Sequence, residues 1–386
     1  MGEERIYELA VVGGGIGGAA CALRAAQYNL RAAWVLGDGM TGKRSRGRWV
    51  VNVDNMIGVH PDLVLDQLRE TWKNRPDLLA ALDGVGHLHI GTDDIVQNVR
   101  RRLEEYAEVV DEIAGAATGA RRLPDGTFAL EVPGAGALGL RARAMIIATG
   151  VMDRQPSIAR LKDGRLLDAT HWVYPFANTE TFLYCLRCEG HLTRGRRVAV
   201  IGGSETAAQI ALMLAERYGS ACCVLGNGEP VVIEDRTRRL MEHYGISVHP
   251  GRLVEVLGGE GAARADLRGF VLEEGTRVTV DFAFVSLGLY RVYNDLARDL
   301  GAALTDEALP EEIRHVRIDA RGETSVPGLF AVGDVAARVG EPVMKQIYTA
   351  QEYAVRAVDT IDWRRRARLR NEILSEPARA ADGGNA

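Results

Sequence analysis

A glycine-rich turn near the start of the chain constrains the fold more than any other feature of the sequence. Residues 5–12 have the apolar composition of a buried parallel strand, and three glycines in the spacing G-x-G-x-x-G follow them. These glycines are Gly13, Gly15 and Gly18. The first permits a tight turn, the second lets the backbone approach a pyrophosphate, and the third lets a helix and a strand pack closely. A helix-forming segment, 19–30, and a strand-like run, 32–36, come next. The pattern predicts a βαβ unit that binds a dinucleotide at the helix N-terminus.

Asp38 is the candidate ribose ligand of this unit, because it stands just past the second strand and about 20 residues after the last glycine. A second unit of the same kind is predicted at 197–225, with a helix over 205–218 and a strand over 221–225. Its turn reads Gly202, Gly203, Ser204, Glu205 and Thr206. The predicted fold class is therefore α/β, with two Rossmann-like dinucleotide-binding domains, each built in three layers around a parallel sheet.

The pair Cys185-Leu186-Arg187-Cys188 lies between the two glycine turns. A C-x-x-C pair is a weak signal alone, but its position between two nucleotide-type turns indicates electron transfer between a bound cofactor and a disulfide. The alternative is half of a zinc site, which needs two more ligands. Because the adjacent Cys222 and Cys223 fall on a predicted buried strand, we expect no metal site. Cys222, Cys223 and Cys21 are interpreted as small buried apolar residues.

Composition excludes several classes of protein. The chain has 386 residues, a net charge of −5 and ordinary apolar content, which do not suggest a nucleic-acid binder or a fibre. No apolar run approaches the roughly 20 residues of a membrane span, and no signal peptide is expected. Five cysteines are few and odd in number. This usage favours a reducing compartment, and we expect a cytoplasmic protein.

Five further segments stand in a fixed order along the chain. They are Val53-Asp54-Asn55-Met56-Ile57-Gly58, Ala148-Thr149-Gly150, Cys185-Leu186-Arg187-Cys188-Glu189-Gly190, Phe330-Ala331-Val332-Gly333-Asp334-Val335 and Lys345-Gln346. With the first glycine turn, they resemble the motifs of the low-molecular-weight thioredoxin reductases. Those motifs are a flavin-contacting V-E-N-x-P-G, an A-T-G that crosses into the second domain, the redox centre C-A-T-C-D-G, the terminal FAD motif, and an R-Q beside the isoalloxazine. The resemblance covers roughly residues 5–360.

The resemblance implies a discontinuous FAD-binding domain, 1–152 and 287–386, around an inserted NAD(P)H-type domain, 153–286, that carries the dithiol. It implies FAD as cofactor, a homodimer, and a thioredoxin-like protein or a small dithiol or disulfide as partner. The FAD-binding residues that it indicates are Gly13, Gly15, Gly18, Asp38, Asn55, Thr149, Gly150, Gly333, Asp334, Lys345 and Gln346. It also implies that Cys188 is the flavin-proximal sulfur, Cys185 the interchange thiol, and Glu189 the residue that donates and accepts the proton.

The second glycine turn departs from the family pattern. Ser204 stands where a glycine would let the backbone touch a pyrophosphate, and its Cβ pushes phosphates away or changes the turn. Residues 225–230 read Leu-Gly-Asn-Gly-Glu-Pro, so the strand end itself carries no arginine to bind a 2′-phosphate and no acid to bind a free 2′-hydroxyl. Use of NADPH or NADH therefore stays open, and so do ferredoxin, a second flavin or a dithiol as the electron donor.

Three functions compete on this sequence. The first is an FAD-dependent thiol-disulfide oxidoreductase that relays electrons through Cys185 and Cys188. The second is a dithiol oxidase that closes disulfides and passes electrons to oxygen. The third is a flavin-binding scaffold whose cysteines are inert or bind zinc.

Some segments have no role in these three functions. The basic run 364–370 is interpreted as a solvated helix face. The alternative, functional interpretation is a docking patch for an acidic electron carrier. The aromatic-rich stretch 163–184 is either core or a cover of the flavin or partner site. His171, His191 and His243 are interpreted as structural residues, His191 being a minor candidate for proton transfer. We expect the tail from about 376 to 386 to be disordered.

Overall fold

The computed structural model divides the chain into two compact units. The first comprises Met1–Gly42, Val96–Gly150 and Tyr293–Ala386, and the second comprises Lys43–Ile95 and Val151–Val292. The structure describes residues 6–38, 45–51, 53, 55–57, 61–82, 90–134, 139–162, 165–169, 176–177, 179–258 and 266–375. Within this part of the chain, no helix is both long and apolar enough to cross a lipid bilayer.

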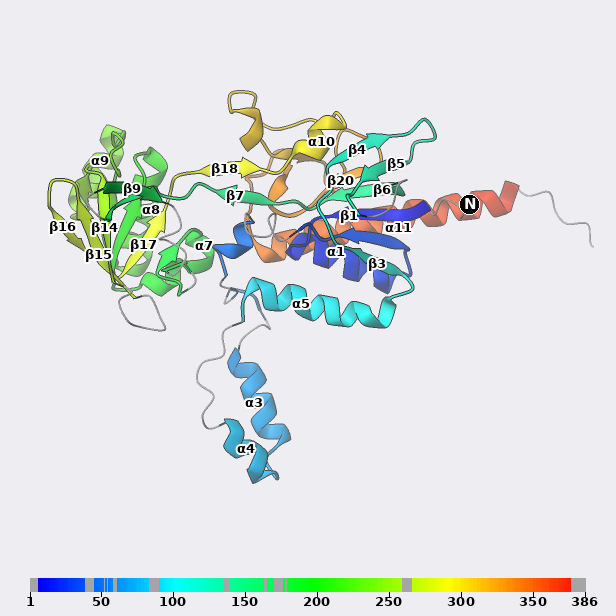
Figure 1. Ribbon diagram of the computed structural model, residues 1–386, viewed down its shortest axis with the longest axis horizontal. Helices are drawn as coiled ribbons and strands as arrows, with labels where there is room; N and C mark the ends of the chain where they lie inside the picture. Colours follow the sequence, from blue (N-terminus) through cyan, green and yellow to red (C-terminus); the bar gives the residue numbers. More distant parts are fainter. Residues whose placement is uncertain are drawn as a thin grey trace, which may run out of the picture. The chain divides into compact units, whose positions relative to one another are not determined.

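A seven-stranded sheet forms the core of the first unit, in the order β3-β2-β1-β6-β5-β4, with β20 paired to the last part of β6 (Figure 1). The parallel strands are β1 (Ile6–Val12), β2 (Ala32–Val35), β3 (Val110–Ile113), β6 (Leu140–Ile147) and β20 (Leu329–Ala331). The antiparallel strands are β4 (Gly119–Arg122) and β5 (Phe128–Glu131). β1 is buried almost throughout because parallel strands are covered on both faces, which explains its unbroken apolar run.

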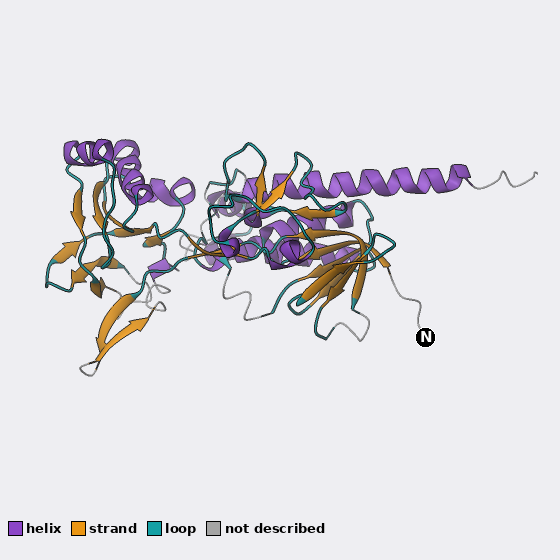
Figure 2. Cartoon of the chain, turned by 90° about the horizontal axis from the view of Figure 1, so that it is seen from above, coloured by secondary structure: helices purple, strands orange, loops and turns teal. Residues whose placement is uncertain are grey.

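Two helices of the first unit pack against each other through small side chains. α1 (Ile16–Gln27) buries Gly17, Gly18 and several alanines, and α11 (Ile347–Ser375) packs along it. Arg24 of α1 also donates to Asp359 of α11 at 2.9 Å. α11 is the long helix that Figure 2 shows running away from the sheet. The smaller elements of this unit are α10 (Asp295–Asp299), β19 (Val316–Ile318) and β21 (Ala336–Arg338), and α5 (Thr92–Leu103) spans the limit between the units.

A five-stranded parallel sheet forms the core of the second unit, in the order β10-β17-β11-β12-β13. Its strands are β10 (Phe182–Leu183), β11 (Arg197–Ile201), β12 (Ala221–Leu225), β13 (Ser247–His249) and β17 (Phe282–Val285). The other strands are β7 (Val151–Asp153), β8 (Ile158–Lys162), β9 (Arg165–Ala169), β14 (Leu253–Gly258), β15 (Leu267–Leu272), β16 (Arg277–Thr279) and β18 (Leu289–Val292). The helices are α3 (Pro61–Thr71), α4 (Pro76–Leu82), α7 (Leu186–Glu189), α8 (Glu205–Tyr218) and α9 (Asp235–His243).

Alternate residues of the second sheet face two different apolar clusters, as the two-residue period of a strand requires. On β11, Val198 and Val200 join the cluster under α8, whereas Ala199 and Ile201 join a cluster that also contains Trp49, Tyr184 and both cysteines of the C-x-x-C pair. The dithiol is therefore built into the apolar layer on one face of this sheet.

The predicted α/β class is confirmed, and both glycine turns join a parallel strand to a helix as expected. The first helix begins at Ile16 rather than Ala19, and the strand after it ends at Val35 rather than Leu36. Contacts group 43–95 with the second unit, although the resemblance gives this segment to the FAD-binding domain. Because grouping by contacts and division by function are different divisions of a chain, the functional limits at 152/153 and 286/287 stay a prediction. The tail 376–386 lies outside the described residues.

Candidate functional site

The first glycine turn is packed at two of its motif glycines and open at the third. A Cβ on Gly13, whose φ is +131°, would lie 2.2 Å from the Ala148 oxygen, and one on Gly18 would lie 1.8 Å from the Gly13 oxygen. Neither contact is sterically possible, so both glycines are required for the turn and for helix packing. A Cβ on Gly15 would meet nothing within 4 Å. The space next to Gly15 is the place where a pyrophosphate approaches the backbone in such units.

The N-terminus of α1 is suited to an anion. Gly15 is its N-cap and has no side chain to occupy the first N–H groups, and the first turn of the helix holds no acidic residue. These N–H groups and the positive end of the helix dipole attract phosphate. The residues of this turn therefore fit the pyrophosphate of FAD.

The other expected FAD residues of the first unit gather at the carboxyl edge of its sheet. Asp38 follows β2, Thr149 and Gly150 follow β6, and Gly333 and Asp334 follow β20, while the glycine turn follows β1. Because these strands are parallel and neighbouring, their carboxyl ends lie at one edge. Thr149 Oγ1 donates to the Tyr293 oxygen at 2.5 Å, which fixes the chain where it leaves β6.

Three expected FAD residues stand apart from this edge in the chain. Gln346 is buried, and its Nε2 donates to the oxygen of Lys345 at 2.9 Å. Asn55 lies in a turn of the second unit. Its neighbours in the expected flavin-contacting segment, Asp54 and Gly58, lie outside the described residues, as do residues 163–164, 170–175 and 178 of the aromatic-rich stretch.

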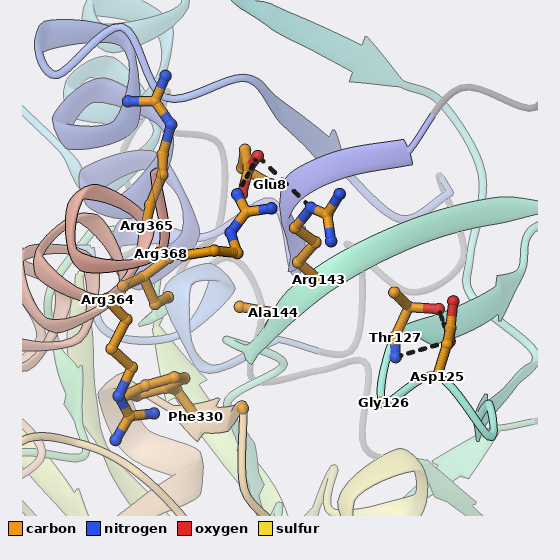
Figure 3. A pocket seen from close by; sticks show the side chains of 12 residues that line it. Glu8, Asp125, Gly126, Thr127, Arg143, Ala144, Phe330, Arg364, Arg365 and Arg368 are labelled. Atoms are coloured by element: carbon orange, nitrogen blue, oxygen red, sulfur yellow. Dashed lines mark hydrogen bonds and ion pairs between the residues drawn. The ribbon is translucent and has the colours of Figure 1, made fainter. Parts of the chain in front are cut away.

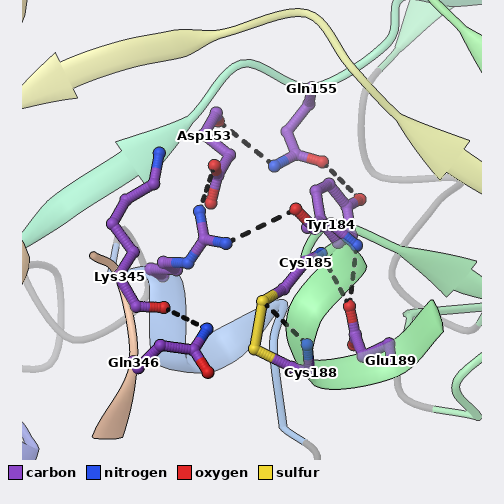
Figure 4. Close-up of polar contacts among 9 residues, drawn as sticks. Asp153, Gln155, Tyr184, Cys185, Cys188, Glu189, Lys345 and Gln346 are labelled. Carbon is purple, nitrogen blue, oxygen red and sulfur yellow. Dashed lines mark hydrogen bonds and ion pairs between the residues drawn. A yellow bond between two sulfur atoms is a disulfide. The ribbon is translucent and has the colours of Figure 1, made fainter. Parts of the chain in front are cut away.

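Cys185 and Cys188 form a disulfide, with their Cα atoms 5.2 Å apart (Figure 4). Cys185 is the N-cap of α7, and its Sγ accepts a hydrogen bond from the Cys188 N–H at 3.2 Å. Arg187 is exposed, whereas both cysteines are 7% exposed. Among the described residues, no group of three or more His, Cys, Asp or Glu could hold a metal ion. The sulfur–sulfur bond places the pair in its oxidised state.

Glu189 directly follows Cys188 in the chain and is almost fully buried. Its Oε2 accepts hydrogen bonds from the N–H groups of Tyr184 at 2.9 Å and Cys185 at 2.8 Å. Burial raises the pKa of Glu189 to about 7, and the two N–H donors and the positive charge of Arg46 limit the rise. A carboxyl with this pKa can hold or release a proton at neutral pH, so the expected proton-transfer group has suitable chemistry.

Sequence reasoning missed a polar network that surrounds Tyr184, the residue before the dithiol (Figure 4). Arg46 forms a buried ion pair with Asp153 and donates to the Tyr184 oxygen at 3.4 Å. Tyr184 also donates through its hydroxyl to Gln155 at 2.7 Å, and its ring lies 5.9 Å from that of Trp49. Arg46 and Asp153 are 107 positions apart, and no local pattern in the sequence connects them.

The second glycine turn is packed as closely as the first, but a side chain of this turn caps the helix that follows it. A Cβ on Gly202 would lie 2.4 Å from the Ser286 oxygen, and one on Gly203 would lie 2.6 Å from the Pro230 oxygen. Ser204 is the N-cap of α8, and its side chain accepts from the Ala207 N–H at 3.4 Å. The position that is open at Gly15 in the first turn is therefore occupied here by a capping side chain.

Neighbouring residues of the second turn also have structural partners. Glu205 accepts from the Glu234 N–H at 2.9 Å and from Thr237 Oγ1 at 2.5 Å, so it holds the start of α9. Asn227 donates to the Ser157 oxygen at 3.0 Å and accepts from the Leu253 N–H at 2.9 Å. Thr206 is exposed, and so are Arg236, Arg238 and Arg239, the later cations that could replace the missing arginine. Nothing in these contacts supplies a ligand for a ribose.

A pocket in the first unit lies away from the glycine turn (Figure 3). It contains Glu8 near the amino end of β1 and Arg143 of β6, whereas Gly13 follows the carboxyl end of β1. Arg368 donates to Glu8 at 2.7 Å, and Arg364 donates to Glu323 at 2.6 Å. Part of the basic run is thus engaged in ion pairs of the unit itself, which agrees with the interpretation as a helix face and gives no support to a docking patch.

Most of the chain matches a known family. The model of the pyridine nucleotide-disulphide oxidoreductases matches residues 7–354. The chain belongs to this family. The predicted class of disulfide oxidoreductase is confirmed by this membership, and the expected resemblance to thioredoxin reductases is confirmed by relatives of that name.

The relatives within the family are distant. One component of the alkyl hydroperoxide reductase of Pseudomonas putida is 27% identical over 340 residues, which are 87% of this chain and 54% of that protein. Thioredoxin reductase of Mycoplasma pneumoniae is 24% identical over 93% of this chain and 95% of its own. The chain spans about half the length of the alkyl hydroperoxide reductase relatives that it matches.

Solved structures share the fold. Thioredoxin reductase from Streptococcus pyogenes superposes with a TM-score of 0.68 at 18% identity and covers 95% of this chain and 100% of its own. An oxidoreductase from Agrobacterium tumefaciens gives a TM-score of 0.66 at 21% identity, with 96% of this chain and 100% of its own covered.

Proposed function

We propose that this family member relays electrons between FAD and the disulfide of a protein or small-molecule partner through Cys185 and Cys188. The observation that carries the proposal is the disulfide at the start of α7, with the buried carboxyl of Glu189 hydrogen-bonded to the backbone of Cys185. A thioredoxin-like partner is suggested by the relatives named thioredoxin reductase, and a hydroperoxide-reducing partner by those named alkyl hydroperoxide reductase.

Glycines 13, 15 and 18 and the N-terminus of α1 would hold the pyrophosphate of FAD. Asp38 would bind its ribose, and Asp334 would bind its ribityl chain, by the match to the family motif. Asn55, Thr149, Gly150, Lys345 and Gln346 complete the proposed set. When bound, FAD supplies two-electron oxidation and reduction. The chain itself must then orient the dithiol, keep bulk water away from it, and manage its protons.

The proposed exchange begins with the reduced dithiol. The Cys185 thiolate attacks a partner disulfide, forms a mixed disulfide and releases one partner thiolate. The Cys188 sulfur then attacks Cys185, which re-forms the internal disulfide and releases the second partner thiolate. Two electrons have passed to the partner, and two protons are needed to leave it as a dithiol. The N–H of Cys188 supports Cys185 as the attacking thiolate, because a thiolate at an N-cap accepts this hydrogen bond.

We propose an electron donor other than a pyridine nucleotide. The support is the difference between the two turns: Gly15 leaves open space, whereas Ser204 caps its own helix. This difference also favours a second candidate function, a dithiol oxidase that takes electrons from a reduced dithiol and passes them to oxygen. The two candidates use the same cysteines and differ in the direction of electron flow.

Location, assembly and domain limits are also proposed. Three free, buried cysteines, Cys21, Cys222 and Cys223, suit a reducing cytoplasm. A homodimer is suggested by the resemblance and by exposed apolar side chains along α11, among them Trp363, Ile373 and Leu374. The division into an FAD-binding domain, 1–152 and 287–386, and an insert, 153–286, follows the resemblance.

The proposed function is tested by anaerobic titration of the flavin-loaded protein with a reduced dithiol while flavin absorbance is followed. We expect the dithiol to bleach the flavin of the wild type and to leave that of Cys188→Ser unchanged. Oxygen uptake with the same dithiol then identifies an oxidase, and reduction of an added protein disulfide by chemically reduced enzyme identifies a reductase. Equal bleaching of the wild type and Cys188→Ser would contradict an electron path through the cysteines.

A further inference from the structure

The buried network around Tyr184 contains the positive charge of Arg46, which has no role in the proposed reaction so far. Arg46 lies in the short 3₁₀ turn Arg46–Arg48, which belongs to the same unit as the dithiol. Its side chain is about 10% exposed, as is that of Asp153, with which it forms an ion pair. A charged residue is rarely buried to this extent unless it is paired, and a buried ion pair is by itself weak evidence of a contribution to stability.

Arg46 reaches the dithiol through the backbone of Tyr184. Its Nη2 donates to the Tyr184 oxygen at 3.4 Å, while the N–H of Tyr184 donates to Glu189 Oε2 at 2.9 Å. The same peptide segment is therefore held on one side by a cation and on the other by the buried carboxyl group. Figure 4 shows Asp153, Tyr184 and Glu189 in this order.

Asp153 and Gln155 fix the other end of this network. The Gln155 side chain donates to the Asp153 backbone oxygen at 3.2 Å and accepts from the Tyr184 hydroxyl at 2.7 Å. Asp153 thus holds the guanidinium of Arg46 with its side chain, while its backbone helps to hold the ring of Tyr184. Tyr184 is held at its backbone oxygen by Arg46 and at its hydroxyl by Gln155. Arg46 therefore has a fixed position relative to Glu189.

We propose that Arg46, anchored by Asp153, is a positioning residue for Glu189. It acts by holding the Tyr184 backbone and by placing a fixed positive charge near the carboxyl group. This role rests on the proposed function, in which Glu189 supplies or accepts a proton when the Cys185–Cys188 disulfide is reduced or formed. Arg46 thereby sets the pH range over which the carboxyl group carries that proton.

The charges that act on Glu189 oppose one another. Arg46 favours the ionised carboxylate, whereas burial and Glu180 favour the protonated acid. Asp153 reduces the effect of Arg46 because its negative charge is paired with the guanidinium. Removing the positive charge should therefore move the protonation midpoint of Glu189 upward, and removing the negative charge of Asp153 should move it downward.

The test follows the carboxylic acid band of Glu189 by infrared spectroscopy of the oxidised, flavin-loaded protein as a function of pH. The band is assigned by its loss in Glu189→Gln. In Arg46→Gln, which retains hydrogen-bond donors, we expect the midpoint to rise by about one pH unit. Arg46→Lys, which keeps the charge, should restore most of the wild-type midpoint. In Asp153→Asn, we expect a shift to lower pH.

Midpoint shifts of opposite sign in Arg46→Gln and Asp153→Asn cannot result from a folding defect. The inference can therefore be tested even if Arg46→Gln is less stable than the wild type. The measurement needs no turnover, so it separates this inference from the proposed function. A protein without dithiol activity could still display both shifts, and an active enzyme could lack them. An unchanged midpoint in Arg46→Gln, or shifts of the same sign in Arg46→Gln and Asp153→Asn, would overturn the inference.

Discussion

Oε2 of Glu189 accepts a hydrogen bond from the backbone N–H of Cys185 at 2.8 Å, and the N–H of Tyr184 donates to the same oxygen. A buried acid is thus joined directly to one half of the redox disulfide. Both donors use a single oxygen, so an amide in place of the carboxyl group could accept both bonds. The geometry therefore separates the charge of Glu189 from its hydrogen bonding.

Glu189→Gln should change how stability depends on pH. Burial raises the pKa of Glu189 to about 7 from its ordinary value of 4.5, so between these values the folded protein keeps a proton that the unfolded chain has lost. The free energy of unfolding of the wild type therefore falls as pH rises from about 4.5 to 7, by roughly 3 kcal/mol from this group. Denaturant unfolding at pH 5 and pH 8 should show a smaller loss in Glu189→Gln.

The matched control is Glu216→Gln, which removes an exposed carboxyl group of α8. Its pH dependence should follow that of the wild type. If Glu189→Gln instead lost as much stability between pH 5 and pH 8 as the wild type, the carboxyl group would be ionised across this range in the folded protein.

The two cysteines should differ in reactivity once the disulfide is reduced. Both are 7% exposed, so access does not distinguish them. The Cys185 sulfur accepts from the Cys188 N–H at the start of α7, and this contact stabilises a thiolate at Cys185. At neutral pH, we expect iodoacetamide to modify Cys185 on the order of tenfold faster than Cys188, as measured by mass spectrometry of the peptides. Faster modification of Cys188 would reverse the assignment of the interchange thiol.

The sequence was sufficient for features whose residues are close together in the chain. A strand, three glycines and a helix form the first turn from about 25 consecutive residues, and C-x-x-C places two sulfurs on one short helix. It was insufficient where partners are distant. Arg46 stands in a basic stretch that looks solvated, and only folding brings it to Asp153. The burial of Glu189 was not visible either, because an acid after a C-x-x-C pair has no apolar pattern of its own.

Gly15→Ala and Gly18→Ala should separate flavin binding from folding. A Cβ on Gly15 would meet nothing within 4 Å, so Gly15→Ala should fold with a thermal midpoint close to that of the flavin-free wild type. It should nevertheless lose most of its FAD, because the added methyl group occupies the approach to the backbone. A Cβ on Gly18 would lie 1.8 Å from the Gly13 oxygen, so Gly18→Ala should express poorly or unfold at lower temperature. Full flavin content in purified Gly15→Ala would show that the pyrophosphate does not approach this position.

Ser204 should keep pyridine nucleotides from reducing the flavin. Its side chain accepts from the Ala207 N–H, and the end of β12 provides Leu225 and Gly226 rather than an arginine or an acid. Under anaerobic conditions, micromolar NADPH or NADH should leave the flavin absorbance of the wild type unchanged. Rapid bleaching of the wild-type flavin by micromolar NADPH would mean that the second turn binds a pyrophosphate despite its serine.

Replacing the serine should restore part of the lost nucleotide site. Ser204→Gly removes the cap and the Cβ, at a loss of only a few tenths of a kcal/mol in helix stability. This variant should bind NADPH more tightly than the wild type in a fluorescence titration, yet still fail to reduce the flavin at micromolar concentrations, because the ribose ligand is still missing. Ser247→Gly, which makes the same change at an exposed serine at the start of β13, is the matched control and should leave binding as weak as in the wild type. Equal affinity of Ser204→Gly and the wild type for NADPH would show that the cap is not what excludes the pyrophosphate.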